Sequence, residues 1–438
     1  MKLSDAQLRR RAQAMKWFAP ARFGLFYHWG LCTGGGCTHS DESWNKPLKY
    51  PTVEALERAV PDSKLVAENM AAFALRAGAK YITLTALHSC DGYCVIYPTK
   101  LKGFVLKTKL DYFGDFVRAA HAKALKPLAY IPCGPEHWNS KGGPWLKEPA
   151  RDNASYSKLM EGLVRELAEQ HGSKLAGFWI DGMTPELRYL PGVIHEVLPD
   201  AVVINNNSTF LEIADVDYGT TEFLAGTPDP DYCRPSALRK IEPRFSITPP
   251  GSDFNEDIPT CNGWFYREGN PGESAKPYLA DPNYLVRQMI SSLGQRGQWN
   301  FALGVGPRVD GTLPPEFEPT FQRLAEFMQW GSEAIYGTRG GEASALAPGF
   351  FAAPWAPGGF CSVSVSLERP GVHYVLVTSA PSVNRAGFHS GGRVPERITD
   401  LRTGAELPFS MMAGPIIENV DWSDVERYGA KVFKVEFK

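Results

Sequence analysis

The sequence predicts an α/β fold: a (β/α)8, TIM-like barrel followed by a C-terminal antiparallel β-sandwich. From about residue 20 to residue 330, short apolar runs alternate with amphipathic helical stretches, as in parallel βαβ units with right-handed crossovers. After Gly340 and Gly341 the helical periodicity ends, and short alternating runs separated by Gly and Pro begin. We therefore expect a barrel domain over residues 1–340 and a β-sandwich over residues 341–438.

The elements of the barrel can be placed from their periodicity. Short continuous apolar runs indicate buried strands, and apolar residues three or four positions apart indicate helices. Strands are expected at 23–29, 80–86, 127–132, 175–181, 201–205, 263–266 and 300–305. Helices are expected at 62–77, 111–124, 153–171, 186–198, 282–293 and 317–330. The stretch 217–267 is otherwise loose and rich in prolines. A strand count close to eight favours a barrel over an open doubly wound sheet.

The C-terminal quarter follows a different pattern. Its alternating runs lie at 360–367, 374–378, 397–400 and 430–437. Gly and Pro separate them, which is typical of short antiparallel strands joined by turns. We find no internal repeat and no low-complexity tract.

Bulk composition limits the possible partners. The 438 residues carry a formal net charge of -2, with 43% hydrophobic and 21% charged residues. This near-neutral balance argues against nucleic acid or an anionic membrane as a partner. Residues 1–13 are polar and helix-prone, and no run of about 18 apolar residues occurs, so we expect a cytoplasmic protein. The oligomeric state stays open.

The eight cysteines are scattered along the chain rather than clustered as in a disulfide scaffold. We therefore expect free thiols. His88, Cys90 and Cys94 could suggest a metal site, but no CxxC pair accompanies them. We expect neither a metal nor an organic cofactor.

The stretch 175–182, Leu-Ala-Gly-Phe-Trp-Ile-Asp-Gly, carries the most informative carboxylate. Its apolar run reads as a buried strand that ends at Asp181. The carboxyl ends of parallel strands are where ligand sites form in α/β folds, so Asp181 is a candidate for chemistry. The alternative is that Asp181 caps the next helix or turn.

Other polar and aromatic residues also stand at expected strand ends. They are His28, Trp29, His88, Tyr130, Asn205 to Asn207 and Trp264. Apolar ring faces beside polar donors suit a sugar, whose C–H faces are apolar and whose hydroxyls need partners. Each residue has a structural alternative: the histidines could be bonded to backbone or to Asp91, and the aromatic residues could fill the core. No GxGxxG, P-loop or HExxH pattern is present.

Five motifs in order resemble those of the α-L-fucosidases of glycoside hydrolase family 29. The first is Phe-Gly-Leu-Phe-Tyr-His-Trp-Gly at 23–30, and the second is Leu-Thr-Ala-Leu-His-Ser-Cys-Asp-Gly-Tyr at 84–93. The third is Phe-Trp-Ile-Asp-Gly at 178–182. The fourth is 300–307 with Asp-Gly-Thr at 310–312, and the fifth is Glu-Ala-Ile-Tyr-Gly-Thr-Arg at 333–339. The resemblance covers residues 17–340.

The resemblance implies a barrel with a C-terminal β-sandwich and a retaining exo-glycosidase that releases a terminal α-L-fucosyl residue from an oligosaccharide or glycoconjugate. Asp181 would be the nucleophile. The sugar-binding residues would be His28, Trp29, Trp44, His88, Tyr130 and Trp264. Members of the family need no metal and no organic cofactor.

Two departures from the family pattern leave alternatives open. Ser89 and Cys90 stand where the family has a second histidine, so a related sugar such as an α-L-galactoside, or saccharide binding without cleavage, is also possible. The acid/base is expected at Glu256, eight residues before Trp264. Glu222 is the rival for that role.

Overall fold

The structure is a computed structural model. It describes residues 4–36, 47–132, 134, 152–182, 184–206, 216–222, 244–248, 264–268, 279–294, 299–341, 361–381, 383–388, 390–412 and 414–438. For residues 7, 11, 219–222, 244–248, 291, 299 and 361 it describes the backbone only.

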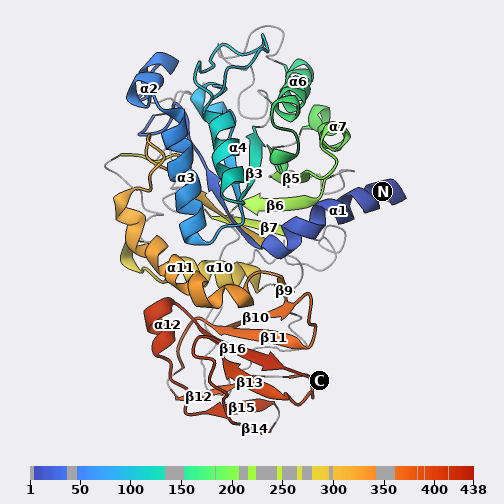
Figure 1. The fold of residues 1–438 in the computed structure, drawn as a ribbon, viewed down its shortest axis with the longest axis vertical. Helices are drawn as coiled ribbons and strands as arrows, with labels where there is room; N and C mark the ends of the chain where they lie inside the picture. The colour runs from blue at the N-terminus through green and yellow to red at the C-terminus, as the bar shows by residue number, and fades with distance from the viewer. Residues whose placement is uncertain are drawn as a thin grey trace.

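Eight parallel strands form a closed barrel in chain order, with the last strand pairing with the first (Figure 1). They are β1 (Phe23–Tyr27), β2 (Tyr81–Thr85), β3 (Lys126–Ile131), β4 (Gly177–Asp181), β5 (Val202–Asn206), β6 (Tyr218–Glu222), β7 (Arg244–Thr248) and β8 (Trp299–Val305). Because all strands run the same way, their carboxyl ends meet at one end of the barrel.

Helices surround this barrel. They are α1 (Asp5–Ala21), α2 (Val53–Ala59), α3 (Ser63–Ala77), α4 (Tyr112–Ala122), α6 (Asn153–His171), α7 (Leu190–Val197), α10 (Tyr284–Leu293) and α11 (Glu318–Gly331). In the described part of the chain no helix lies between β5 and β6 or between β6 and β7. An α/β barrel of parallel strands is therefore established, while the full (β/α)8 repeat stays a prediction. None of the helices in these ranges has the length and apolarity needed to cross a bilayer.

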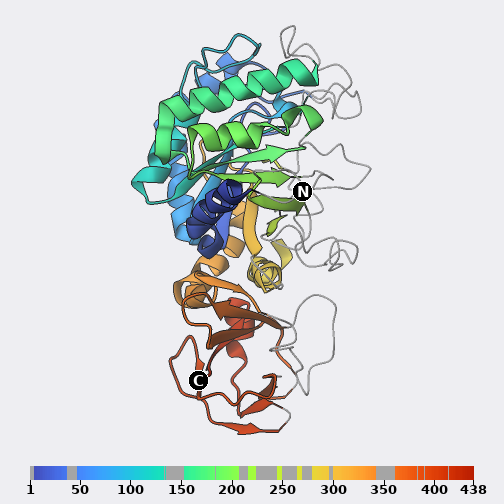
Figure 2. The same ribbon diagram turned by 90° about the vertical axis from the view of Figure 1, so that its right-hand side faces the viewer.

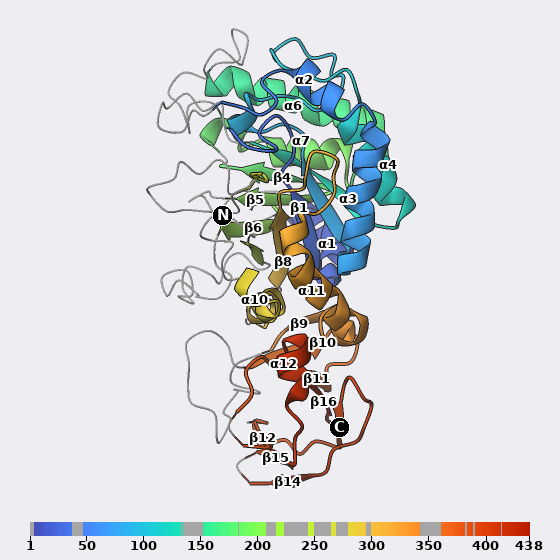
Figure 3. The same cartoon turned by 90° about the vertical axis from the view of Figure 1, so that its left-hand side faces the viewer.

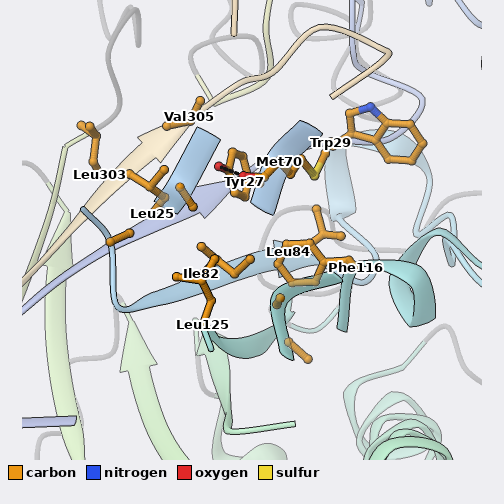
Figure 4. Close-up of a cluster of buried hydrophobic side chains, with 14 of the residues drawn as sticks. Leu25, Tyr27, Trp29, Met70, Ile82, Leu84, Phe116, Leu125, Leu303 and Val305 are labelled. Atoms are coloured by element: carbon orange, nitrogen blue, oxygen red, sulfur yellow. Dashed lines mark hydrogen bonds between the residues drawn. The ribbon is translucent and has the colours of Figure 1, made fainter. Parts of the chain in front are cut away.

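In the barrel strands whose side chains are described, the side chains alternate between the inside of the barrel and the helix layer. Phe26, Leu128, Trp179 and Ile204 belong to the interior cluster. Their sequence neighbours pack outward against the helices; these include Leu25, Tyr27, Ala129, Phe178, Ile180 and Val203. Figure 4 shows part of the outer layer, where Leu25 and Tyr27 lie among residues of α3 and α4. A strand has a side-chain period of two, so the residue two positions after each interior residue is also interior.

Helix α1 closes the amino end of the barrel. Phe18 on α1 is fully buried, and its ring lies 4.9 Å from that of Tyr81 and 4.5 Å from that of Tyr218. Tyr81 and Tyr218 are the first residues of β2 and β6. A ligand must therefore approach the interior from the carboxyl end.

Two antiparallel sheets form the C-terminal part. One has the order β13-β16-β11-β10-β9 and the other β12-β15-β14. The strands are β9 (Thr338–Gly340), β10 (Cys361–Ser366), β11 (Val372–Val377), β12 (Arg385–Gly387), β13 (Arg397–Asp400), β14 (Phe409–Met411), β15 (Pro415–Glu418) and β16 (Lys431–Glu436). Helix α12 (Ser423–Tyr428) precedes β16.

The five-stranded sheet is buried on both faces. On β11, Tyr374 and Leu376 belong to the core shared with the barrel, whereas Val375 and Val377 share a core with Ile417 of the smaller sheet. Helices α10 and α11 lie between the barrel and these sheets in all three views (Figures 1, 2 and 3). The C-terminal part therefore packs on the flank of the barrel through α10 and α11.

The proline-rich stretch differs from the expectation. The strand expected at 263–266 is wrong over its described part, because residues 264–266 form a turn. The sixth and seventh barrel strands lie instead at 218–222 and 244–248. Both are five residues long, and prolines at 243, 249 and 250 obscure the second in the sequence.

One stability prediction concerns a buried charge cluster in the C-terminal part. The Lys431 ammonium lies 2.5 Å from Asp400 and 3.0 Å from Asp424, and all three side chains are less than a tenth exposed. Removing the cation in Lys431→Met leaves buried carboxylates without that partner, so the free energy of unfolding should fall by about 3–5 kcal/mol. Urea denaturation measures this change.

The exposed pair of Arg385 and Glu418 provides the control. Both side chains are about half exposed. Arg385→Ala should therefore change the free energy of unfolding by less than about 1 kcal/mol. Equal effects of the two substitutions would refute the assignment of Lys431 as a buried structural charge.

Candidate active site

The two-residue side-chain period of the strands brings four interior-facing side chains to the open end of the barrel. His28 follows Phe26 by two positions, Tyr130 follows Leu128, Asp181 follows Trp179, and Asn206 follows Ile204. All four are buried, with Asp181 8% exposed and the others 3% or less.

Asp181 accepts a hydrogen bond on each carboxylate oxygen. The Tyr130 hydroxyl donates to Oδ2 at 2.8 Å, and the Asn206 side-chain amide donates to Oδ1 at 2.8 Å. The strand register explains the second bond, because Asp181 and Asn206 are direct partners of β4 and β5. Two uncharged donors thus stabilise a buried carboxylate and fix its plane.

The His28 ring lies among other rings. It stacks on Phe26 at 4.3 Å between centroids and lies 5.6 Å from His88. The backbone is held on both sides: the His28 amide donates to the Val305 carbonyl, and the Thr85 side chain bonds to both backbone groups of the next residue, Trp29. His28 is therefore placed by the two strands next to β1.

His88 is oriented by the short helix η1 (Ser89–Asp91) that follows it. The Cys90 amide donates to His88 Nδ1 at 3.1 Å, and Asp91 Oδ1 accepts from the His88 amide at 3.3 Å. Since Nδ1 accepts, the neutral ring carries its proton on Nε2 and can donate from there. The ring also stacks on Tyr130, at 5.2 Å and 11° between planes.

Residues 264–268 form a loop segment over the histidines. The Trp264 ring lies 4.9 Å from the His28 ring, and Phe265 meets both histidines edge-on, at 5.7 Å from His28 and 5.2 Å from His88. The backbone of this segment packs directly on Gly306, where a Cβ would lie 2.3 Å from the Tyr266 nitrogen. The segment also pairs with Gly34, whose amide donates to the Tyr266 carbonyl at 2.8 Å and which forms a parallel bridge with Arg267. Contacts with Gly306 and Gly34, outside the eight barrel strands, therefore place Trp264.

Burial is the main reason why His28 is uncharged. It lowers the pKa of His28 well below the usual value, the nearby His88 lowers it further, and a backbone contact to Phe26 opposes this more weakly. His28 is therefore neutral near pH 7 and can accept or donate a hydrogen bond without adding charge to the site.

This arrangement agrees with comparisons to known proteins. Residues 2–333 match the family "Alpha-L-fucosidase". The chain belongs to the α-L-fucosidase family. It is 22% identical over 373 residues to the tissue α-L-fucosidase of Rattus norvegicus, a match that covers 74% of this chain and 70% of that protein.

Solved structures of α-L-fucosidases share its fold. Isoenzyme 1 from Paenibacillus thiaminolyticus matches with a TM-score of 0.70 and 19% identity, over 98% of this chain and 100% of that one. A glycoside hydrolase family 29 enzyme from Bacteroides thetaiotaomicron, trapped as a covalent intermediate in complex with 2-fluoro-fucosyl fluoride, matches with a TM-score of 0.69 and 18% identity, over 97% and 96%.

The structure brings His28, His88, Tyr130, Asp181 and Trp264 together in this family member, but Trp29 does not join them. Trp29 is fully buried in the outer core, where Figure 4 shows it with other residues of that layer. Its indole donates to the Val309 carbonyl at 3.0 Å, and its ring packs on Tyr112. The expectation that Trp29 binds sugar is thus corrected: as the neighbour of His28, it points to the opposite face of the chain.

The remaining predicted residues have less complete descriptions. Trp44 and Glu256 lie outside the described residues. Glu222 is the last residue of β6, which puts its backbone at the same end of the barrel as Asp181, but its side chain is not described. Their roles stay predictions.

Sequence reasoning missed Phe265, which packs on both histidines of this fucosidase-family site. Asn206 was expected at a strand end and Asp91 as a possible partner of a histidine, and Asp91 does accept from the His88 amide. The bond from Asn206 to Asp181 was not expected. No sequence signal pairs Asn206 with Asp181, since that pairing depends on strand register.

The cysteines near the site are thiols. Cys32, Cys90 and Cys94 are buried cysteines outside any disulfide, and Cys32 Sγ donates to the Cys90 carbonyl at 3.0 Å. His88 Nδ1 accepts from a backbone amide rather than binding a metal, and the described ranges contain no group of three or more His, Cys, Asp or Glu placed to hold an ion. Cys32 and Cys90 instead share a small apolar cluster with Phe265.

The state of His28 leads to a prediction about pH. Because its folded pKa lies below the unfolded value of about 6.5, His28 stabilises the fold fully above pH 6.5, and this contribution is lost as the pH falls. Between pH 7.5 and 5.5, the wild-type free energy of unfolding should therefore fall by about 1 kcal/mol more than that of His28→Gln. Urea denaturation at the two pH values measures the difference, and identical pH dependence would contradict a neutral buried His28.

Proposed function

We propose that this chain is a retaining α-L-fucosidase that hydrolyses terminal α-L-fucosides of oligosaccharides or glycoconjugates, with Asp181 as nucleophile. One observation carries the proposal. Asp181 stands at the carboxyl end of β4 with both oxygens held by neutral donors, in a barrel mouth lined by His28, His88 and Trp264. Family membership supplies the substrate class.

The rings around Asp181 suit a deoxy sugar. His88 would donate from Nε2 to a ring hydroxyl, because its Nδ1 is occupied by the Cys90 amide. The neutral ring of His28 would bond a second hydroxyl. Trp264 and Phe265 offer apolar faces to the C–H groups of the sugar. The thiol cluster of Cys32, Cys90 and Phe265 adds an apolar wall where the family has a second histidine.

The first chemical step would form a glycosyl ester. A lone pair of the ionised Asp181 carboxylate forms a bond to C1 of the sugar while the bond from C1 to the leaving oxygen breaks. The electron pair of that bond goes to the leaving oxygen, which takes a proton from the acid/base. This geometry needs a second carboxyl about 5–5.5 Å from Asp181.

The second step would return the enzyme to its starting state. A water oxygen attacks C1 and gives a proton to the acid/base, and the ester bond breaks with its electrons returning to Asp181. Two inversions leave the product with the configuration of the substrate. We assign the acid/base to Glu256 from its spacing to Trp264, with Glu222 as the alternative because β6 ends at it.

Two broader expectations belong to the same proposal. The complete (β/α)8 repeat with a C-terminal β-sandwich is supported by the closed order of the eight parallel strands and by the two antiparallel sheets. A cytoplasmic location is supported by the sequence alone.

Substitution of the nucleophile tests the function. Asp181→Ala should lower kcat on a nitrophenyl α-L-fucoside at least about 1,000-fold, which corresponds to about 4 kcal/mol of transition-state stabilisation. For the wild type, proton NMR of early product should show α-L-fucose first. Full activity of Asp181→Ala, or β-L-fucose as first product, would refute the retaining mechanism. A panel that includes an α-L-galactoside measures sugar preference, and release of no α-L-sugar would favour saccharide binding without cleavage.

Rescue by azide identifies the acid/base. An activated aryl fucoside needs no protonation of its leaving group, so the variant lacking the acid/base still forms the ester but hydrolyses it slowly. Azide attacks that ester without base assistance. We expect azide to accelerate Glu256→Ala with formation of a fucosyl azide, whereas Glu222→Ala should not respond. Rescue of Glu222→Ala alone would move the assignment to Glu222.

A further inference from the structure

We propose that Asn206 is a positioning residue that anchors the non-attacking oxygen of Asp181 through both chemical steps, so that Oδ2 is the oxygen that bonds to the sugar. The inference rests on the proposed function, because it assigns roles to the two oxygens of the nucleophile.

The two oxygens of Asp181 face different sides of the barrel mouth. Oδ2 accepts from Tyr130 on β3, and the Tyr130 ring stacks on His88. Oδ1 accepts from Asn206 on β5, the strand on the opposite side of β4. The described rings that suit a sugar, His28, His88 and Trp264, lie on the Tyr130 side. A sugar bound there would meet Oδ2 first.

Asn206 is built for a fixed contact. Its side chain is 2% exposed, and its backbone carbonyl also accepts from the Gly182 amide at 3.0 Å, directly after Asp181. The end of β4 is therefore tied to Asn206 through both backbone and side chain. A rigid strand rather than a loop holds the donor, which keeps the carboxylate plane within the narrow range that in-line attack requires.

The hydrogen bond from Asn206 to Oδ1 persists through both chemical steps, whereas the bond from Tyr130 to Oδ2 does not stay the same. When Oδ2 bonds to C1, Oδ1 becomes the carbonyl oxygen of the ester and can still accept from Asn206. When water releases the sugar, negative charge returns to the carboxylate, and the Asn206 amide is already in place to stabilise it. Asn206 should therefore assist both steps, whereas Tyr130 must adjust as Oδ2 becomes bonded.

Several titratable groups face Asp181. The described ones are Tyr130 on β3, His28 after β1 and His88 before η1, and the proposed mechanism adds the acid/base carboxyl at about 5–5.5 Å. Asn206 itself carries no charge. Replacing it by aspartate would put a second carboxylate within hydrogen-bond distance of Asp181, and two such groups cannot both ionise easily.

The test uses the full chain with Asn206→Ala and Asn206→Asp. Loss of a hydrogen bond to a charged group should lower kcat/KM on nitrophenyl α-L-fucoside about 10- to 100-fold in Asn206→Ala. In Asn206→Asp, the acidic limb of the kcat/KM profile should move to higher pH by about one unit or more, because the pair must lose a shared proton. A purely structural role would lower activity without moving this limb.

Asn205→Ala is the matched control. Asn205 is the adjacent buried amide on the same strand, but it has the opposite strand parity and pairs with the outward-facing Ile180. The acidic limb of the kcat/KM profile of Asn205→Ala should stay at the wild-type pH. The near-isosteric Asn206→Asp also keeps the test valid if the alanine variant does not fold.

The outcomes separate the two proposals. No hydrolysis of any α-L-fucoside by the wild type would refute the proposed function. An active wild type, with kcat/KM of Asn206→Ala within about twofold and an unmoved acidic limb in Asn206→Asp, would refute only the role of Asn206.

Discussion

The two-residue side-chain period of the barrel strands is the constraint on which the site depends. Trp179 fills the interior of the barrel, so Asp181, two positions later, must emerge at its open end. The same relation carries Phe26 to His28 and Leu128 to Tyr130. A slip of one residue in β4 would put Ile180 in the mouth and send the carboxylate into the helix layer. The same strand register therefore determines both which residues fill the barrel core and which residues form the site.

Burial then determines how the site handles charge. A buried carboxylate is costly unless it is hydrogen-bonded, and a strong ion pair would stabilise it so well that it attacked poorly. Tyr130 and Asn206 satisfy Asp181 with neutral donors instead. His28, kept neutral by burial, adds polarity without charge. The carboxylate can therefore stay ionised, oriented and available for bonding to a sugar.

Much of the fold and part of the site could be predicted from the sequence because strong local patterns carry them. Continuous apolar runs ending in His28 and Asp181 identified two strand ends, and the loss of helical periodicity after residue 340 indicated antiparallel sheets. Strands β6 and β7 could not be found, because five-residue strands among prolines lack a clear period.

The contacts that were missed, and the one residue that was misassigned, depend on geometry that local patterns do not encode. Asn206 reaches Asp181 through the register of β4 and β5. Trp264 is held by a segment whose backbone packs on Gly306 and pairs with Gly34, outside the eight barrel strands. Trp29 was misassigned because it follows His28 in the sequence, although the alternation of side chains puts adjacent residues on opposite faces. The outward direction of Trp29 could therefore have been predicted from the sequence alone.

Covalent labelling tests the central claim most directly. 2-Fluoro-fucosyl fluoride should form a slowly hydrolysed ester with the nucleophile. The fluorine at C2 destabilises the oxocarbenium-like transition states of both steps, whereas the good leaving group fluoride keeps the first step fast enough for the ester to accumulate. Mass spectrometry of the digested protein should place one 2-fluoro-fucosyl group on Asp181. An adduct on any other carboxylate, or inactivation without an adduct on the peptide containing Asp181, would contradict the account.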